Sequence, residues 1–140
     1  MRGRAGQLAV LVLLGCAPLC AHCETGWHDG LVVSVQDGVH LKVATPGNHA
    51  RLMRIVGVCA PVIGHAYGRK SKFSLSDLAL LKTVQWRRQG ESVSVSTRVS
   101  VMVDGKDLAT LQLERGMAAI DFATTDQLQG AQRDAYMKAQ

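Results

Sequence analysis

The sequence predicts a small, mainly β fold of the α+β class, and three features support this prediction. β-Branched and apolar residues alternate with polar ones through several short segments, as in half-buried strands. Turn sequences containing glycine separate these segments, and the clearest is Asp37-Gly38, which favours a tight hairpin. One stretch between the third and fourth segments has helical spacing instead. The length of 140 residues suits a single domain of this kind.

The first half of the domain is predicted to be a three-stranded meander. Residues 30–36 are rich in valine and end at the Asp-Gly turn. Residues 39–43 alternate apolar and polar side chains with the period of two that a half-buried strand requires. A turn around Pro46 follows, and residues 52–58 form the third strand.

The second half mixes helices with two further strands. Residues 67–81 place apolar side chains on one helical face, and residues 83–86 and 93–103 return to strand patterning. A short helix is expected over 108–113 and a final one over 126–139. Five strands with a helix between the third and fourth is the order of the OB-fold, a small barrel that binds oligonucleotides. We therefore expect a five-stranded OB-fold barrel with two to three helices.

Residues 1–23 have the pattern of a secretory signal peptide. Two arginines precede a short apolar run, which small residues follow. The apolar run is too short for a permanent transmembrane helix. We expect cleavage near Ala21 to Cys23, a single domain at residues 24–140, and a secreted or periplasmic monomer without a transmembrane span.

Lipoprotein processing at Cys16 stays open, because the Leu-Leu-Gly-Cys sequence there loosely matches a lipoprotein box. Cleavage beyond Cys23 would leave Cys59 as the single cysteine and exclude an internal disulfide. It would also leave 14 basic against 11 acidic side chains, a net charge of +3 in place of +5. This small excess is compatible with nucleic-acid binding but does not indicate it.

Six motifs resemble, in order, those of the staphylococcal-nuclease-like (thermonuclease) family. They are Gly30-x-Val32-Val33-x-Val35-x-Asp37-Gly38, Arg54-Ile55-Val56-Gly57-Val58-Cys59-Ala60-Pro61, Tyr67-Gly68-Arg69-Lys70-Ser71, Val103-Asp104-Gly105-Lys106-Asp107-Leu108, Leu113-x-x-Gly116-Met117-Ala118 and Arg133-x-x-Tyr136. The resemblance covers nearly the whole domain and implies an OB-fold barrel. It also implies calcium-dependent phosphodiester hydrolysis, with carboxylates on the metal, a Glu base, and two arginines on the phosphate.

The positions that would carry this chemistry are mostly altered. By the resemblance, Val39 and Cys59 stand where the family has metal-binding Asp, and Val62 replaces the Glu base. Valine can neither bind calcium nor take a proton. Asp37 matches as a weak metal position, and Arg54 matches the first phosphate-binding arginine. We therefore expect no cofactor, with Ca²⁺ bound only if the family activity survives.

The second arginine of the family pattern is left open by the sequence. Counting back from Asp104 puts Ser96 at its position, whereas Arg98 fits only if the strand slips by two residues. Such a slip keeps the side chain on the same face. The alternative is that Arg98 is an ordinary solvent-facing strand residue.

Other basic residues also have two interpretations. Arg54 either binds phosphate or forms a structural ion pair with Asp37 across the hairpin. Arg69 and Lys70 are candidates for substrate binding, or they are solvated cations on a helix. Most of the six aromatic residues match core or anchoring positions, so base stacking has little support.

An alternative metal site would combine Asp37, His40 and Cys59, because thiolate and imidazole are good zinc ligands. Neighbours on a strand face opposite ways, however, so His40 should point away from the site that Val39 occupies. The simpler interpretation is that Cys59 is a buried thiol and His40 an exposed histidine.

Three functions remain open. The first is an exported pseudo-nuclease, impaired in catalysis, that retains weak phosphate or nucleic-acid binding. The second is an active metal-dependent phosphodiesterase or endonuclease with a non-standard site around Asp37, Arg54, Cys59 and Arg98. The third is an envelope protein-interaction module. DNA or RNA is the partner expected of the first two.

Overall fold

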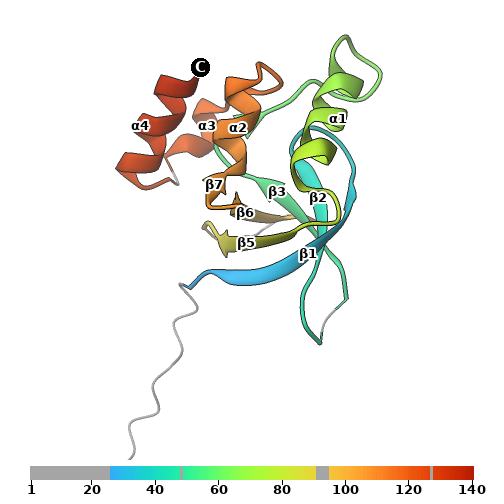
Figure 1. Ribbon diagram of the computed structural model, residues 1–140. Helices are drawn as coiled ribbons and strands as arrows, with labels where there is room; N and C mark the ends of the chain where they lie inside the picture. The colour runs from blue at the N-terminus through green and yellow to red at the C-terminus, as the bar shows by residue number, and fades with distance from the viewer. Residues whose placement is uncertain (1–25, 48, 91–94, 127) are drawn as a thin grey trace, which may run out of the picture.

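The fold is a closed five-stranded barrel, seen in a computed structural model that describes residues 26–47, 49–90, 95–126 and 128–140. Its strands are β1 (His28–Val35), β2 (His40–Ala44), β3 (Arg51–Ile55), β5 (Thr83–Arg88) and β6 (Thr97–Val103). Neighbouring strands are antiparallel except β3 and β6, whose parallel pairing closes the barrel (Figure 1). The predicted OB-fold barrel is thereby confirmed. The predicted signal peptide lies outside the described residues and stays a prediction.

In the described part of the chain, four helices accompany the barrel: α1 (Gly68–Ala79), α2 (Leu108–Glu114), α3 (Phe122–Thr125) and α4 (Gly130–Ala139). Figure 1 shows them on one side of the barrel, with the start of β1 and the β2–β3 loop on the other. The expected helices correspond to α1, α2 and α4, whereas α3 is an additional short helix that Asp121 caps. No helix in the described part of the chain is long and apolar enough to cross a membrane.

The third strand is shorter than the sequence suggests. β3 ends at Ile55, and Gly57 turns the chain with φ +79° into β4 (Val58–Cys59), which pairs with β8 (Ala119–Ile120) in a separate two-stranded sheet. A side chain at Gly57 would lie 2.6 Å from the Tyr136 ring. The turn therefore needs glycine both for its backbone angle and for this close approach.

The fifth barrel strand begins later than predicted. β6 starts at Thr97, and Val95 is 97% exposed, whereas residues 93 and 94 of the predicted strand lie outside the described residues. A short strand β7 (Lys106–Asp107) then pairs with the end of β6 through the Asp104-Gly105 turn. The period of two identified the strand but not the point at which pairing begins.

The interior of the barrel is filled by residues at alternate strand positions. Val32, Leu41, Met53, Val84 and Val99 are all buried there. Leucines of α1 and α2 cover one end of this core. Because the strands alternate, the residues between these positions lie on the outer face of the barrel.

Tyr136 of α4 is the largest fully buried side chain. Its hydroxyl accepts a hydrogen bond from Gln132 Nε2 at 3.1 Å, and burial raises the pKa of that hydroxyl. α4 is thereby held against the turn at Gly57, close to the segment that carries the candidate site.

The Asp37-Gly38 turn joins β1 and β2 as the sequence predicts. Asp37 Oδ1 accepts hydrogen bonds from the backbone N–H groups of Val39 and His40, both at 2.8 Å. A side chain at Gly38 would collide with the Ser71 side chain on α1. The turn is therefore packed directly on α1, which holds the neighbouring residues in place.

Candidate functional site

Three half-buried side chains form a row on the outer face of the barrel. His40 on β2 is the register partner of Arg54 on β3, and Arg54 is the register partner of Arg98 on β6. Residues directly opposite each other on paired strands point to the same face. The fold therefore places an imidazole and two guanidinium groups side by side, although they are far apart in the sequence.

Val39 and His40 face opposite ways as expected, but the residue that shares a face with Arg54 is His40 and not Val39. Val39 is 5% exposed and belongs to the hydrophobic core, whereas His40 shares the outer face with Arg54. The two residues do face opposite ways, as strand geometry requires. The error lay in assigning Val39 to the surface that carries Arg54, because Val39 is in phase with the buried Leu41 and Val43.

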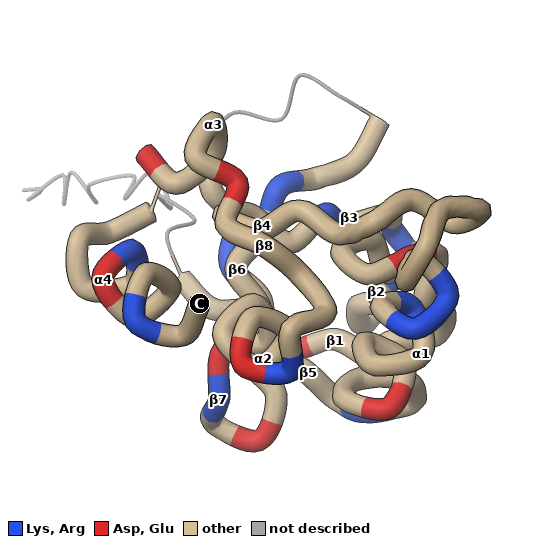
Figure 2. Tube along the Cα trace, turned by 90° about the horizontal axis from the view of Figure 1, so that it is seen from above, with Lys and Arg blue, Asp and Glu red and all other residues tan. Residues whose placement is uncertain are grey.

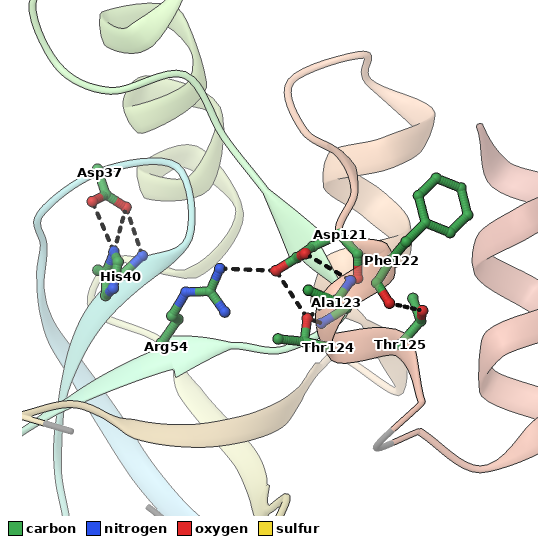
Figure 3. Close-up of polar contacts among 9 residues, drawn as sticks. Asp37, His40, Arg54, Asp121, Phe122, Ala123, Thr124 and Thr125 are labelled. Atoms are coloured by element: carbon green, nitrogen blue, oxygen red, sulfur yellow. Dashed lines mark hydrogen bonds and ion pairs between the residues drawn. The ribbon is translucent and has the colours of Figure 1, made fainter. Parts of the chain in front are cut away.

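Asp37 and His40 form a close pair at one end of this row (Figure 3). His40 Nδ1 lies 2.8 Å from Asp37 Oδ2 and 3.0 Å from Oδ1, which makes Nδ1 the ring nitrogen that carries the donated proton. Burial tends to raise the pKa of the Asp37 carboxyl, but the His40 ring and the backbone N–H groups of the turn outweigh it. They hold that pKa below its usual value.

Arg54 pairs with Asp121 and not with Asp37, which corrects the alternative ion pair proposed from the sequence. Arg54 Nη2 donates to Asp121 Oδ2 at 3.2 Å, and both side chains are largely buried. Asp121 lies 67 positions further along the chain and was not identified by the sequence reasoning. The one local signal was its place before a short helix, where aspartate commonly caps the first turn.

Further hydrogen bonds fix the Asp121 carboxylate at the start of α3 (Figure 3). It accepts from the Ala123 backbone N–H at 3.1 Å and from the Thr124 hydroxyl at 3.0 Å. That hydroxyl accepts in turn from the Gly57 N–H at 3.0 Å. Burial tends to raise the pKa of the Asp121 carboxyl, yet the contacts from Thr124 and Arg54 hold it below its usual value. Asp121 is therefore an ionised partner for Arg54.

Arg98 lies on β6 opposite Arg54, and Ser96 lies just before that strand. Arg98 is half-buried and in register with Arg54, whereas Ser96, the residue reached by counting back from the turn, is 8% exposed. No described acidic residue forms an ion pair with Arg98. Its role in function stays a prediction, but the fold brings it to Arg54.

Cys59 and Val62 do not join this row. Cys59 is exposed on β4, contrary to the expected buried thiol, and Val62 is 67% exposed. Among the residues that the structure describes, no three His, Cys, Asp or Glu side chains gather closely enough to hold a metal ion. The Asp37–His40 pair is therefore not completed by Cys59.

Arg69 and Lys70 lie exposed in the first turn of α1. Lys70 Nζ sits 5.0 Å from the centre of the exposed Tyr67 ring. Figure 2 shows basic residues on α1, β6 and α4, and acidic residues among them on α2, on α4 and in the turns. The positive charge is thus spread over the molecule, and these two residues remain candidates for substrate contact.

The aromatic residues are more exposed than the sequence suggested. Tyr136 is buried, but four of the six aromatic side chains are exposed to solvent: Trp27, Tyr67, Phe73 and Phe122. The family pattern had placed most of them in core or anchoring positions. Surface rings for stacking are therefore present.

Comparison with known proteins supports a nuclease-like relationship. The chain is 33% identical, over 87 residues, to a protein of Haemophilus influenzae described as an uncharacterized endonuclease. The match covers 62% of this chain and 49% of that protein, so the chain spans about half the length of this relative. No family model matches the sequence. The similarity and the closed barrel together are consistent with a nuclease-like fold.

Proposed function

We propose that this chain is a nuclease-like domain of the thermonuclease type that binds the phosphate backbone of single-stranded nucleic acid and is impaired in calcium-dependent hydrolysis. The register of Arg54 with Arg98 carries the proposal. Two guanidinium groups on one face match the geometry of phosphate oxygens. Similarity to a protein described as an endonuclease supports nucleic acid as the ligand class.

The residues at the family's metal positions do not fit a calcium ion. Calcium takes oxygen ligands, mostly carboxylates and carbonyls. The Val39 side chain lies in the core, Val62 offers an exposed alkyl group, and Cys59 offers a thiol. Asp37 supplies a carboxylate, but the His40 ring already engages it. We therefore derive no hydrolytic step through calcium.

The Arg54–Asp121 pair explains why binding should be weak. A phosphate group that approaches Arg54 competes with a carboxylate held at 3.2 Å. Part of the attraction between the guanidinium and the incoming phosphate is therefore offset by repulsion from Asp121. Among the described residues, no other partner engages the remaining side-chain N–H groups of Arg54 or those of Arg98, so these groups can contact a ligand.

A binding and cleavage assay on the full chain tests the proposal, with fluorescein-labelled single-stranded oligothymidylate as the probe. We expect binding that weakens steeply with salt and no cleavage in calcium. Arg54→Gln and Arg98→Gln should each weaken binding roughly tenfold, because each removes a charged phosphate contact. Lys138→Gln, which removes an exposed cation from α4, is the matched control.

Two results would contradict the proposal. Calcium-dependent cleavage that Arg54→Ala abolishes would mean that the site is catalytically intact. Absence of binding even at low salt would favour the protein-interaction module instead. A nucleic-acid contact made through phosphates cannot be insensitive to salt.

The Asp37–His40 pair favours a second candidate function, metal-independent cleavage of RNA. Asp37 holds Nδ1 of the ring, which leaves Nε2 to exchange a proton with a substrate. In this reaction Nε2 takes the proton of a ribose 2′-hydroxyl, whose oxygen attacks the adjacent phosphorus. Arg54 neutralises the phosphorane, and the departing 5′-oxygen takes the proton back from His40.

This second candidate predicts a 2′,3′-cyclic phosphate product from RNA in the presence of a chelator. His40→Gln should abolish that product, and DNA should remain uncut because it lacks the 2′-hydroxyl. RNA that stays intact with the wild-type chain would exclude the reaction and leave the binding function as proposed.

A further inference from the structure

The end of the barrel away from α1 and α2 is an open mouth lined by inward-facing residues. Arg51 lies two positions before the buried Met53 and shares its face, and Arg88 is the register partner of the buried Val99. His28 is likewise the register partner of Trp86. The strand positions that bury valine and methionine deeper in the barrel thus carry polar and basic side chains at this end.

A hollow of about 150 Å³ occupies the mouth. Its lining residues are His28, Arg51, Met53, Trp86, Arg88 and Thr97. They come from four of the five barrel strands, β1, β3, β5 and β6, and Met53, which is fully buried, forms its floor. The hollow is therefore a product of barrel closure, not a groove between loops.

A larger hollow of about 600 Å³ continues outward from the first and shares His28, Arg51 and Trp86 with it. The rest of its wall is formed by Trp27 and Asp29, and by Thr45 and Pro46 of the β2–β3 loop. A volume of this order lies within the range of about 300–1,000 Å³ that is typical of small-molecule sites. Barrel mouths are among the places where such sites occur.

The charge of the mouth favours an anion. Within the described chain, the side chains of Arg51 and Arg88 form no ion pair and no hydrogen bond. Asp29 is the one acidic residue that lines either hollow, and it lies at an outward-facing position of β1. Two unpaired guanidinium groups that line one open hollow are suited to binding the oxygens of a phosphate.

The same mouth offers planar aromatic surfaces. The His28 and Trp86 rings are 4.8 Å apart, and the Arg87 guanidinium lies 4.9 Å from the centre of the Trp27 ring. Trp27 is 42% exposed, so its indole is accessible from the larger hollow. Exposed aromatic rings beside arginines are the combination that binds nucleobases by stacking.

We propose that the barrel mouth binds a nucleoside monophosphate, either free or as the end of a single strand. The phosphate lies between Arg51 and Arg88, and the base lies against the indole rings. This site faces the interior of the barrel, whereas Arg54 and Arg98 lie on the outer face. It is therefore separate from the site of the proposed function and does not depend on it.

Intrinsic fluorescence gives a direct readout, because both tryptophans of the chain line the mouth. The full chain is titrated with thymidine monophosphate, thymidine and inorganic phosphate. We expect saturable quenching by the monophosphate, with thymidine and phosphate each binding roughly tenfold more weakly, because each lacks one of the two contacts. If a hexathymidylate with a terminal 5′-phosphate binds more tightly than the monophosphate, the ligand of the mouth is the end of a strand. If the two bind equally, the ligand is a free nucleotide.

Single substitutions separate this site from the outer one. Arg51→Gln and Arg88→Gln should each weaken monophosphate binding roughly tenfold, whereas Lys138→Gln should not change it. Arg54→Gln should leave the quenching by thymidine monophosphate intact while reducing oligonucleotide binding at the outer face. Failure of the mouth proposal can therefore be told apart from failure of the proposed function. Thermal unfolding of each variant checks that the barrel still forms.

Three outcomes would overturn the mouth proposal. Thymidine binding as tightly as the monophosphate would exclude the phosphate contact. Inorganic phosphate binding as tightly would reduce the mouth to an anion site without base recognition. Unchanged affinity in both folded arginine variants would show that the mouth residues do not hold the ligand.

Discussion

Arg54 donates a hydrogen bond to Asp121 across 67 positions of the chain, and this contact joins the third barrel strand to the start of α3. The carboxylate also caps α3 and accepts from Thr124. One acidic side chain therefore stabilises a short helix and competes with any anion that approaches Arg54. Its two roles can be separated by substitution.

Asp121→Asn should increase the affinity for single-stranded oligonucleotides severalfold. Asparagine caps helices about as well as aspartate, so α3 is retained while the competing charge is removed. Fluorescence anisotropy at several salt concentrations measures the change. Asp126→Asn is the matched control, because Asp126 is an exposed acid paired with Arg133 at 3.7 Å. Equal gains in the two variants would mean that overall charge, and not the Arg54 contact, limits binding.

Val39→Asp should lower the free energy of unfolding by about 3 kcal/mol or more, because it places a carboxylate in the hydrophobic core. Val62→Glu should change it by less than about 0.5 kcal/mol, because Val62 is largely exposed. Urea unfolding of both variants makes the comparison. A well-tolerated Val39→Asp would place this side chain at the surface, where the family resemblance expected it.

Gly57→Ala should cost more than Gly47→Ala in unfolding free energy. Both glycines have positive φ, +79° and +72°, so both substitutions carry a left-handed backbone penalty of about 1–2 kcal/mol. Only at Gly57 would the new methyl group also meet Tyr136 and Leu128, whereas nothing lies within 4 Å at Gly47. Matched thermal or urea unfolding isolates the packing cost, and equal losses would argue against close contact between α4 and this turn.

Acid should destabilise the domain through Asp37 and Asp121. Their pKa values are lower in the folded chain than the ordinary value of 3.8. The unfolded state therefore binds protons first as pH falls, and stability present above the unfolded pKa is lost on the way down to the folded pKa. Urea unfolding between pH 6 and pH 3 should show this loss of stability. It should begin at about the pH where the carboxyl groups of the unfolded chain start to bind protons.

The Asp37→Asn variant checks that this dependence is local. Its stability should fall less steeply with acid than that of the wild type, because one of the two responsible carboxyl groups is gone. Asp134→Asn, on the exposed side of α4, should retain the wild-type slope. Identical slopes in all three proteins would assign acid sensitivity to other groups.

The strands and their order could be predicted because they rest on local pattern. The valine-rich alternation before Asp37 and the helical spacing after Tyr67 each correspond to an element of the structure. The sequence did not predict the break at Gly57, because the segment around it also has the local pattern of a strand. The mostly apolar run from Leu52 to Val58 reads as one strand, but the turn at Gly57 directs the chain into the β4–β8 pair and packs against Tyr136.

The site was predicted less completely, because its partners come from distant segments. The sequence identified Arg54 as a candidate site residue, but the acidic partner that it offered as the alternative, Asp37, is not the one that Arg54 contacts. Neither the Asp121 contact nor the register with Arg98 has a signature within one element, since both depend on how strands and loops meet after closure.

The sequence by itself determined the barrel class and the hairpin at Asp37. These follow from residue type and short-range periodicity, which act within a few positions of the chain. Tertiary structure alone decided which arginines share a face, which carboxylate meets Arg54 and which residues line the barrel mouth. Closing the barrel through the parallel β3–β6 pair decides the first and the third, because it sets the register between segments more than 40 residues apart. The pairing of β4 with β8 decides the second, because it brings Asp121 next to the end of β3.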